Sequence, residues 1–181
     1  FATGRTYSVS TIVEVLRQCL YLSDLWGFPL LLLSCDIAQA FDSMGHWEIC
    51  CALRRCQGDP QAAAAVFQEL CGMVGTATVG GCEATLPSSI TKGARTGGGE
   101  SPALLNLVVR AAMESLVVKW DQRGYGFPIE GRARRITHMV WADNVYILAV
   151  SAPQATCMLK DLTVALARLR LRWKRKSMEC L

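Results

Sequence analysis

Histidine is scarce in this sequence, which has only His46 and His138 among its 181 residues. The nine cysteines include the adjacent pair Cys50-Cys51 but no C-x-x-C pair, so their spacing fits neither a zinc ribbon nor a disulfide framework. Metal chemistry must therefore rest on carboxylates, which are the ligands that hard cations prefer. Buried free thiols in a reducing compartment are the simplest interpretation of the cysteines.

Long hydrophobic runs are also missing. The longest, residues 25–35, is interrupted by Pro29, whereas a membrane-spanning helix needs about 20 apolar residues. We therefore expect a buried strand here and no membrane partner. No secretory signal is found at the N-terminus. Because the chain starts at Phe1 within a patterned segment, we expect it to be part of a longer polypeptide.

Charged residues make up only 19% of the chain and hydrophobic residues 51%, which excludes a disordered tail and allows a sizeable core in one domain. The net charge of +4 is unevenly distributed. Residues 1–75 hold 4 basic and 7 acidic side chains (−3), and residues 76–181 hold 15 basic and 8 acidic ones (+7). The positive part suggests a polyanionic partner, although a solvated basic face would give the same pattern.

Apolar spacing and turn residues predict the order strand, helices, hairpin, helix, hairpin, helix, strand after a first amphipathic helix. This order predicts a compact α+β domain, with a mostly antiparallel sheet and helices packed on one face. Helices are expected over residues 8–22, 43–57, 61–74, 102–119 and 152–169, and strands over 30–35, 168–176 and within hairpins at 76–86 and 136–150.

Two carboxylates stand where predicted strands end. Asp36 follows the strand at 30–35, and Asp143 lies at the tip of the hairpin at 136–150. Taken singly, each is better explained as a solvent-facing turn residue. On neighbouring central strands, however, the two could share a pair of Mg²⁺ ions about 3.5–4 Å apart, an arrangement that activates a hydroxyl and stabilises a leaving pyrophosphate.

Two further segments suit a phosphate-rich substrate. Gly97, Gly98 and Gly99 precede a helix for which Ser101 is the expected N-cap and Pro102 the first residue. Their backbone N–H groups could approach phosphate, and a plain flexible loop is the alternative. Residues 168–176 hold six basic side chains, which suits contacts with a nucleic-acid backbone.

These segments, taken in order, resemble the palm of a reverse transcriptase, an RNA-directed DNA polymerase, and are most similar to the non-LTR retrotransposon and group II intron branch. The resemblance covers nearly the whole chain, with residues 1–29 similar to part of the fingers and 30–181 to the palm; the thumb and upstream fingers would be absent. It is carried by D-I-A-Q-A-F-D (36–42, motif A), G-A-R-T-G-G-G-E-S-P-A-L-L-N (93–106, motif B), W-A-D-N (141–144, motif C) and L-R-L-R-W-K-R-K-S (169–177, motif D).

The resemblance implies a role for each matching residue. Asp36 and Asp143 would be catalytic and would bind two Mg²⁺ ions, for which Mn²⁺ could substitute, and Lys176 would neutralise the triphosphate or donate a proton to pyrophosphate. Phe41 would be the steric gate that rejects a ribose 2′-OH, and Asn106 would support the motif B helix. The nucleotide-binding set would be Ala40, Phe41, Arg95, Gly97 and Lys176, and the template- and primer-binding set Arg5, Thr96, Ser101, Pro102 and Asn144. Core packing is the alternative for Phe41, and an ordinary surface charge for Lys176 and Arg5.

The chain departs from the family pattern at two positions. Asn144 replaces the second acid of motif C, which removes one negative charge from the metal site although an amide oxygen can still act as a ligand. We expect weakened metal binding with the chemistry retained and Mn²⁺ favoured. Thr96 stands where the family has glutamine, and Glu100 could supply a compensating carboxylate.

The resemblance therefore implies template-directed addition of deoxynucleotides to a primer 3′-OH. The expected partners are an RNA template, a DNA primer, deoxynucleoside triphosphates and the remainder of a larger polyprotein, in an intracellular, nuclear setting. A catalytically inactive RNA-binding module that keeps the palm is the alternative, favoured by Asn144 and Thr96. A palm-type nucleotide cyclase fits less well, because the motif B helix and the Phe41 gate belong to template-directed polymerases.

Overall fold

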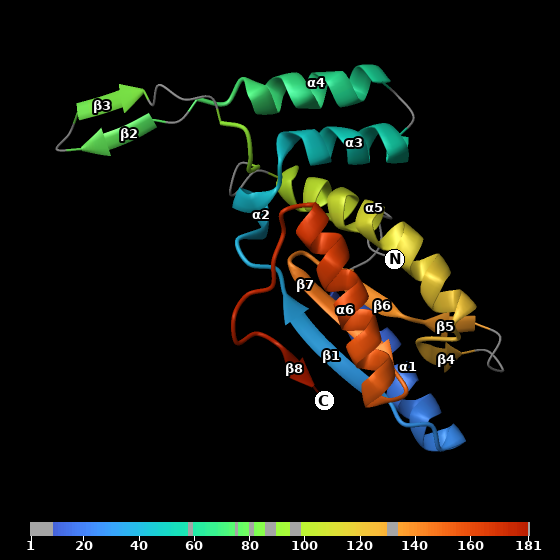
Figure 1. The fold of residues 1–181 in the computed structure, drawn as a ribbon. Coiled ribbons are helices and arrows are strands. Elements are labelled where there is room, and N and C mark those ends of the chain that lie inside the picture. Colours follow the sequence, from blue (N-terminus) through green and yellow to red (C-terminus); the bar gives the residue numbers. More distant parts are fainter. Residues whose placement is uncertain are drawn as a thin grey trace.

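The computed structural model describes residues 9–57, 60–74, 76–79, 82–85, 90–94, 99–129 and 134–180. These residues form helices and strands in the order shown in Figure 1. The helices are α1 (Val9–Trp26), α2 (Ala40–Ser43), α3 (His46–Gln57), α4 (Pro60–Cys71), α5 (Ser101–Gln122) and α6 (Ala152–Arg168). The strands are β1 (Leu31–Asp36), β2 (Thr76–Val79), β3 (Cys82–Thr85), β4 (Phe127–Ile129), β5 (Arg134–Ile136), β6 (His138–Trp141), β7 (Asn144–Ala149) and β8 (Glu179–Cys180).

The main sheet has the strand order β6-β7-β1-β8, and all of its pairs are antiparallel. The two central strands pair along their whole length, from Leu31 opposite Ala149 to Asp36 opposite Asn144. Two separate hairpins, β2-β3 and β4-β5, complete the strands of the described part. The predicted α+β class with a mostly antiparallel sheet is confirmed.

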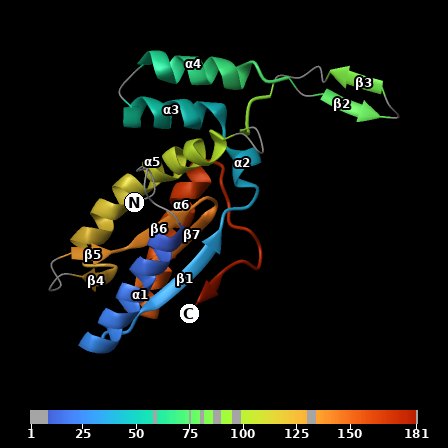
Figure 2. The same ribbon diagram turned by 180° about the vertical axis from the view of Figure 1, so that it is seen from behind.

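Both faces of the main sheet are covered, which explains the run of four leucines at residues 30–33. Leu31 and Leu33 pack into one hydrophobic cluster with α5 and α6, whereas Leu30 and Leu32 pack into a second cluster with α1. Successive side chains of a strand point to opposite faces, so a strand buried on both sides needs apolar residues at every position. Figures 1 and 2 show α6 on one face and α1 on the other. The helix α1 thus adds a second layer to the helices expected on one face.

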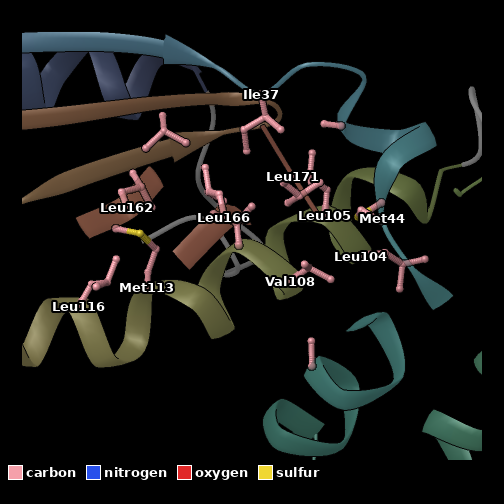
Figure 3. Packing of buried hydrophobic residues seen from close by; sticks show 14 of the residues in the cluster. Ile37, Met44, Leu104, Leu105, Val108, Met113, Leu116, Leu162, Leu166 and Leu171 are labelled. Atoms are coloured by element: carbon pink, nitrogen blue, oxygen red, sulfur yellow. The ribbon is translucent and has the colours of Figure 1, made fainter. Parts of the chain in front are cut away.

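The main core lies between the sheet and α5 and α6 and extends past the end of β1 (Figure 3). Ile37, directly after Asp36, is 1% exposed and belongs to this core. Burial of each such side chain contributes about 1.5–3 kcal/mol relative to exposure. The strand end that carries Asp36 is therefore firmly anchored. Other members include Met44, which follows α2, Leu104, Leu105 and Val108 of α5, Leu162 and Leu166 of α6, and Leu171.

The helix α5 is the one helix of the described part that is long and apolar enough to cross a membrane, a test that buried core helices also pass. Here its side chains at Leu105, Val108, Met113 and Trp120 are buried within the protein. The absence of a membrane partner stays a prediction.

Two local predictions are wrong. Residues 168–176 are not a strand: α6 ends at Arg168, and Arg170, with φ 58°, closes it through hydrogen bonds from its own N–H to Ala167 and from the Leu171 N–H to Leu166. This left-handed closure is the usual way in which a helix satisfies its last carbonyls. At the start of α5 the N-cap is Glu100, and Ser101 lies inside the helix.

Candidate active site

The pairing of β1 with β7 brings Asp36 and Asp143 to the same end of the sheet. Asp36, the last residue of β1, pairs with Asn144, the first residue of β7, and Asp143 immediately precedes it. The N–H of Ile37 donates a hydrogen bond of 2.8 Å to the carbonyl oxygen of Asp143. The two acids are thus held on neighbouring central strands by backbone hydrogen bonds.

The turn that carries Asp143 is tight. Trp141 pairs with Asn144, so only Ala142 and Asp143 lie between the two strands. Ala142 has φ 50°, a left-handed conformation that costs a residue with a side chain about 1 kcal/mol or more. Backbone strain of this kind is tolerated where the surrounding pairing fixes the turn. It places the acid at the tip, as the sequence predicted.

The C-terminal segment 172–177 fastens the backbone around Asp36. The N–H of Lys174 donates to the carbonyl oxygen of Asp36 at 2.8 Å, and the N–H of Asp36 donates to Oγ of Ser177 at 3.2 Å. The N–H of Ala38 donates to the carbonyl oxygen of Arg172 at 2.8 Å. Motif D therefore lies beside motif A and holds Asp36 from the side opposite Asp143.

Lys174 is the lysine that contacts a candidate metal ligand. Its Nζ lies 3.8 Å from Oδ2 of Asp36, and the two side chains are 66% and 26% exposed. Lys176, which the resemblance selects, is exposed and has φ 65°. Lys174 was not among the site residues predicted from the sequence. Its contact with Asp36 follows from the bridge between Trp173 and Ile37, next to Asp36, and no sequence signal indicates that bridge.

The donor set at this strand end fits a hard cation that is shared with a substrate. Asp36 and Asp143 offer carboxylate oxygens and Asn144 an amide oxygen. Among the residues that the structure describes, no group of three or more histidine, cysteine or acidic side chains is placed to hold a metal ion. Magnesium commonly binds one or two protein carboxylates and takes its other ligands from phosphate and water. A cage made of protein ligands alone does not fit.

The residues expected near the nucleotide sugar lie just beyond β1, in α2 (Figure 1). Ala40 is 3% exposed and Phe41 is half-buried against the main core. Gln39, with φ 46°, turns the chain into this short helix. Phe41 is both packed against the core and partly accessible, so core packing and the gate role both stay open for it.

The motif B residues fall into two groups. Arg95, Thr96 and Gly97 lie outside the described residues, as does Arg5 of the fingers segment. Ser101 is 2% exposed, which makes it a buried helix residue, whereas Pro102 beside it is exposed. Ser101 is thus enclosed by protein, and its role in template binding stays a prediction.

The start of motif B is hydrogen-bonded to motif A. The N–H of Gly93 donates to the carbonyl oxygen of Met44 at 2.7 Å, and the N–H of Ala94 donates to that of Phe41 at 2.8 Å. His46 lies 2.9 Å from the carbonyl oxygen of Gly93 through its Nε2. His46 was not among the site residues predicted from the sequence, and no sequence signal indicates its contact with Gly93.

The far end of the motif B helix is tied to α6 by Asp161, which accepts a hydrogen bond of 3.1 Å from Nε1 of Trp120 and pairs with Lys119. Burial alone would raise the pKa of Asp161, but the hydrogen bonds from Lys119 and Trp120 outweigh it and hold the pKa below its ordinary value of 3.8. The carboxylate is therefore ionised at neutral pH.

The thiols are only partly as expected. Cys19 and Cys35 are buried, and burial raises the pKa of each to about 11, with a smaller contribution from Asp36 at Cys35. Both stay protonated at neutral pH. Cys71, Cys157 and Cys180 are free but exposed, which corrects the expectation that the free thiols are buried.

No family model and no curated protein matches this sequence. Solved structures do match. The telomerase from Candida albicans, in complex with a TWJ fragment of telomeric RNA, superposes with a TM-score of 0.73 at 9% sequence identity, over 97% of this chain and 32% of that one. The apo telomerase from Candida tropicalis, truncated from its C-terminal domain, gives a TM-score of 0.56 at 8% identity, over 97% of this chain and 35% of that one.

This chain thus spans about a third of the length of each telomerase chain. At such low identity the likeness speaks for the fold, since unrelated functions share folds. It agrees with the antiparallel sheet and the helices packed on it. The chain has a reverse-transcriptase-like fold.

Proposed function

We propose that this chain is the palm, with part of the fingers, of an RNA-directed DNA polymerase that adds deoxynucleotides to a primer 3′-OH. The observation that carries the proposal is the pairing of Asp36 with Asn144, which sets Asp36 and Asp143 side by side at one end of the central strands. The reverse-transcriptase-like fold supports it. The order of the four sequence motifs supports the non-LTR or group II intron branch and an origin in a retrotransposon-type element.

In this proposal the side chains around the strand end would act on a triphosphate. Asp36 and Asp143 would hold divalent cations together with the substrate phosphates, and Lys174 and Lys176 would lie on the side where negative charge collects. Two bound Mg²⁺ ions would lower the pKa of the primer hydroxyl and neutralise the leaving pyrophosphate. Phe41 would exclude a ribose 2′-OH. The basic residues between 168 and 176 would contact the nucleic-acid backbone.

A catalytically inactive RNA-binding module is the second candidate. It is favoured by Asn144 in place of an acid and by the contact of the Lys174 ammonium with Asp36, a position where a cation would otherwise sit. This candidate predicts RNA binding that weakens with salt, ignores Mg²⁺ and survives the substitution Asp36→Ala.

Primer extension on an RNA template, with deoxynucleotides and either Mg²⁺ or Mn²⁺, distinguishes the two candidates. The longer parent polypeptide is compared with its Asp143→Ala and Asn144→Asp variants. Extension that Asp143→Ala abolishes would support the polymerase. Extension by Asn144→Asp alone would mean that the asparagine has switched off an otherwise intact site. No extension by the parent or by Asn144→Asp, with RNA still bound, would leave the binding module.

A further inference from the structure

A buried histidine joins the segments that carry motifs A and B. His46, the first residue of α3, is 3% exposed. Its Nε2 lies 2.9 Å from the carbonyl oxygen of Gly93, so the ring carries its proton on Nε2 and donates it there. Its Nδ1 is also buried and has no hydrogen-bond partner within the described part of the chain.

An imidazole in this position is not what packing alone would select. A buried acceptor without a donor carries a desolvation penalty, and an apolar side chain of similar size would avoid it. The hydrogen bond to Gly93 is the one interaction found here that an apolar side chain could not replace. The other contacts of Gly93 therefore determine which part of the structure the His46 hydrogen bond stabilises.

Gly93 holds the turn that contains Phe41. The N–H groups of Gly93 and Ala94 donate to the carbonyl oxygens of Met44 and Phe41, at 2.7 and 2.8 Å. Gly93 has φ 94°, which suits glycine, and a Cβ added there would lie 3.5 Å from Cα of Asp42. We call residues 41–46 and 91–94 the Gly93 clamp. In it the side chain of His46 binds the carbonyl oxygen of Gly93, and the carbonyl oxygens of Met44 and Phe41 accept hydrogen bonds from the N–H groups of Gly93 and Ala94.

We propose that His46 is a positioning residue that fixes the ring of Phe41 and thereby determines how well ribonucleotides are rejected. The inference rests on the proposed polymerase function, because it concerns the sugar that Phe41 would face. A steric gate discriminates only when its ring cannot move away from a 2′-OH. A shift of the ring by much less than the width of one atom would already make room for the hydroxyl. Loss of the Gly93 bond frees the peptide groups that hold the Phe41 backbone.

The test compares His46→Leu, which removes the donor, with His46→Gln, whose side-chain amide N–H can replace it. Leu53→Ala is the matched control, because Leu53 is 3% exposed on the same helix and is not part of the Gly93 clamp. All three are made in the longer parent polypeptide. For each, kcat/KM is measured with a deoxynucleotide and with the matching ribonucleotide.

We expect His46→Leu to lower the preference for deoxynucleotides about tenfold, His46→Gln to restore it to within about threefold of the parent, and Leu53→Ala to leave the ratio unchanged even where both rates fall. In a Phe41→Ala background, His46→Leu should change the ratio no further. An equal fall of both efficiencies in His46→Leu, with the ratio preserved, would overturn the proposal.

Hydrogen exchange at the backbone amides of Gly93 and Ala94 tests the Gly93 clamp without any activity. We expect faster exchange at both amides in His46→Leu, and parent-like protection in His46→Gln and Leu53→Ala. Unchanged protection in His46→Leu would overturn the positioning role. A parent that does not polymerise, yet shows this exchange pattern, would refute the polymerase and the sugar selection while the clamp itself stands.

Discussion

Replacing Asp161 by alanine should destabilise the contact between the motif B helix α5 and α6. Its carboxylate accepts a hydrogen bond from Nε1 of Trp120 at 3.1 Å and pairs with Nζ of Lys119. Trp120 is completely buried, so its N–H cannot turn to water when the acceptor is removed. The side chain of Asp161 is 19% exposed and that of Lys119 39%.

The expected loss follows from these two contacts. A buried donor left without a partner costs about 1–3 kcal/mol, and a partly exposed ion pair contributes up to about 1 kcal/mol. The substitution Asp161→Ala should therefore lower the free energy of unfolding by about 1–4 kcal/mol. Asp161→Asn keeps an oxygen acceptor for Trp120 and loses the charge, so it should cost about 1 kcal/mol.

Urea unfolding, followed by tryptophan fluorescence and by circular dichroism, measures these differences. The control is Glu114→Ala on the same helix, where Nε of Arg110 and Oε1 of Glu114 are 4.0 Å apart and both side chains are 55% exposed. That exposed pair should contribute less than about 0.5 kcal/mol. Equal losses for Asp161→Ala and Glu114→Ala would refute the reasoning, since burial of Trp120 would then make no difference.

The same contact predicts how stability depends on pH. Because the pKa of Asp161 in the folded protein lies below its ordinary value of 3.8, ionisation of this carboxylate stabilises the fold. Its contribution is complete well above pH 3.8 and is lost as the pH falls through the lower, folded-state pKa. The difference in stability between the parent and Asp161→Asn should therefore be constant near neutral pH and shrink below pH 3.8. A gap that widens on acidification would contradict the assigned direction.

Substitutions at Gly126, Lys174 and Asn144, two of them with a comparison variant, test one turn of the fold and the charges of the site. Gly126 has φ 103° and its Cβ would lie 2.8 Å from the Ile136 carbonyl oxygen, so Gly126→Ala should cost about 2–4 kcal/mol in thermal unfolding. Gly27 has φ 65° and open space around it, so Gly27→Ala should lower the stability by only about 1 kcal/mol. Equal losses of stability in Gly27→Ala and Gly126→Ala would contradict the assumed clash at Gly126. Removing the ammonium in Lys174→Ala should tighten Mn²⁺ binding two- to tenfold by calorimetric titration, with Lys176→Ala as the unaffected control. Asn144→Asp should lower the Mg²⁺ concentration needed for extension, and an unchanged requirement would show that the second acid is not a ligand.

The positions of β1, β6 and β7 and the meeting of the two acids could be predicted, because local sequence pattern marks where these strands end. The apolar run before Asp36 and the short turn at Asp143 each mark the end of a strand, and antiparallel pairing of the two strands then brings those ends together. The alternation in residues 168–176 was misleading for a physical reason. Leu171 and Trp173 are buried or half-buried at alternate positions, but they follow a helix-closing turn instead of continuing a strand ladder.

The contacts of Lys174 and His46 could not be predicted because they depend on pairing between distant segments. Which lysine of motif D reaches Asp36 is decided by the pairing of Trp173 with Ile37. The partner of His46 is the backbone carbonyl group of Gly93. Because every residue has a backbone carbonyl group, the sequence does not indicate which one is the partner. A motif match selects residue types, whereas the tertiary pairing decides which atoms meet.

The asparagine of motif C changes charge more than shape. The position of Asp143 is set by the two-residue turn, by the Trp141–Asn144 pair and by the hydrogen bond from Ile37, and all of these use backbone atoms. An aspartate at 144 would therefore meet the same backbone, so the geometry of the first two acids does not depend on the missing third one. The loss that remains is electrostatic, and Lys174 adds to it by placing a positive charge beside Asp36. Supplying the acid at 144 and removing the ammonium at 174 should thus act in the same direction on cation affinity. If both changes act on the charge of the same cation site, their effects on cation affinity should not be additive. The double variant should then differ from the sum of the two single variants.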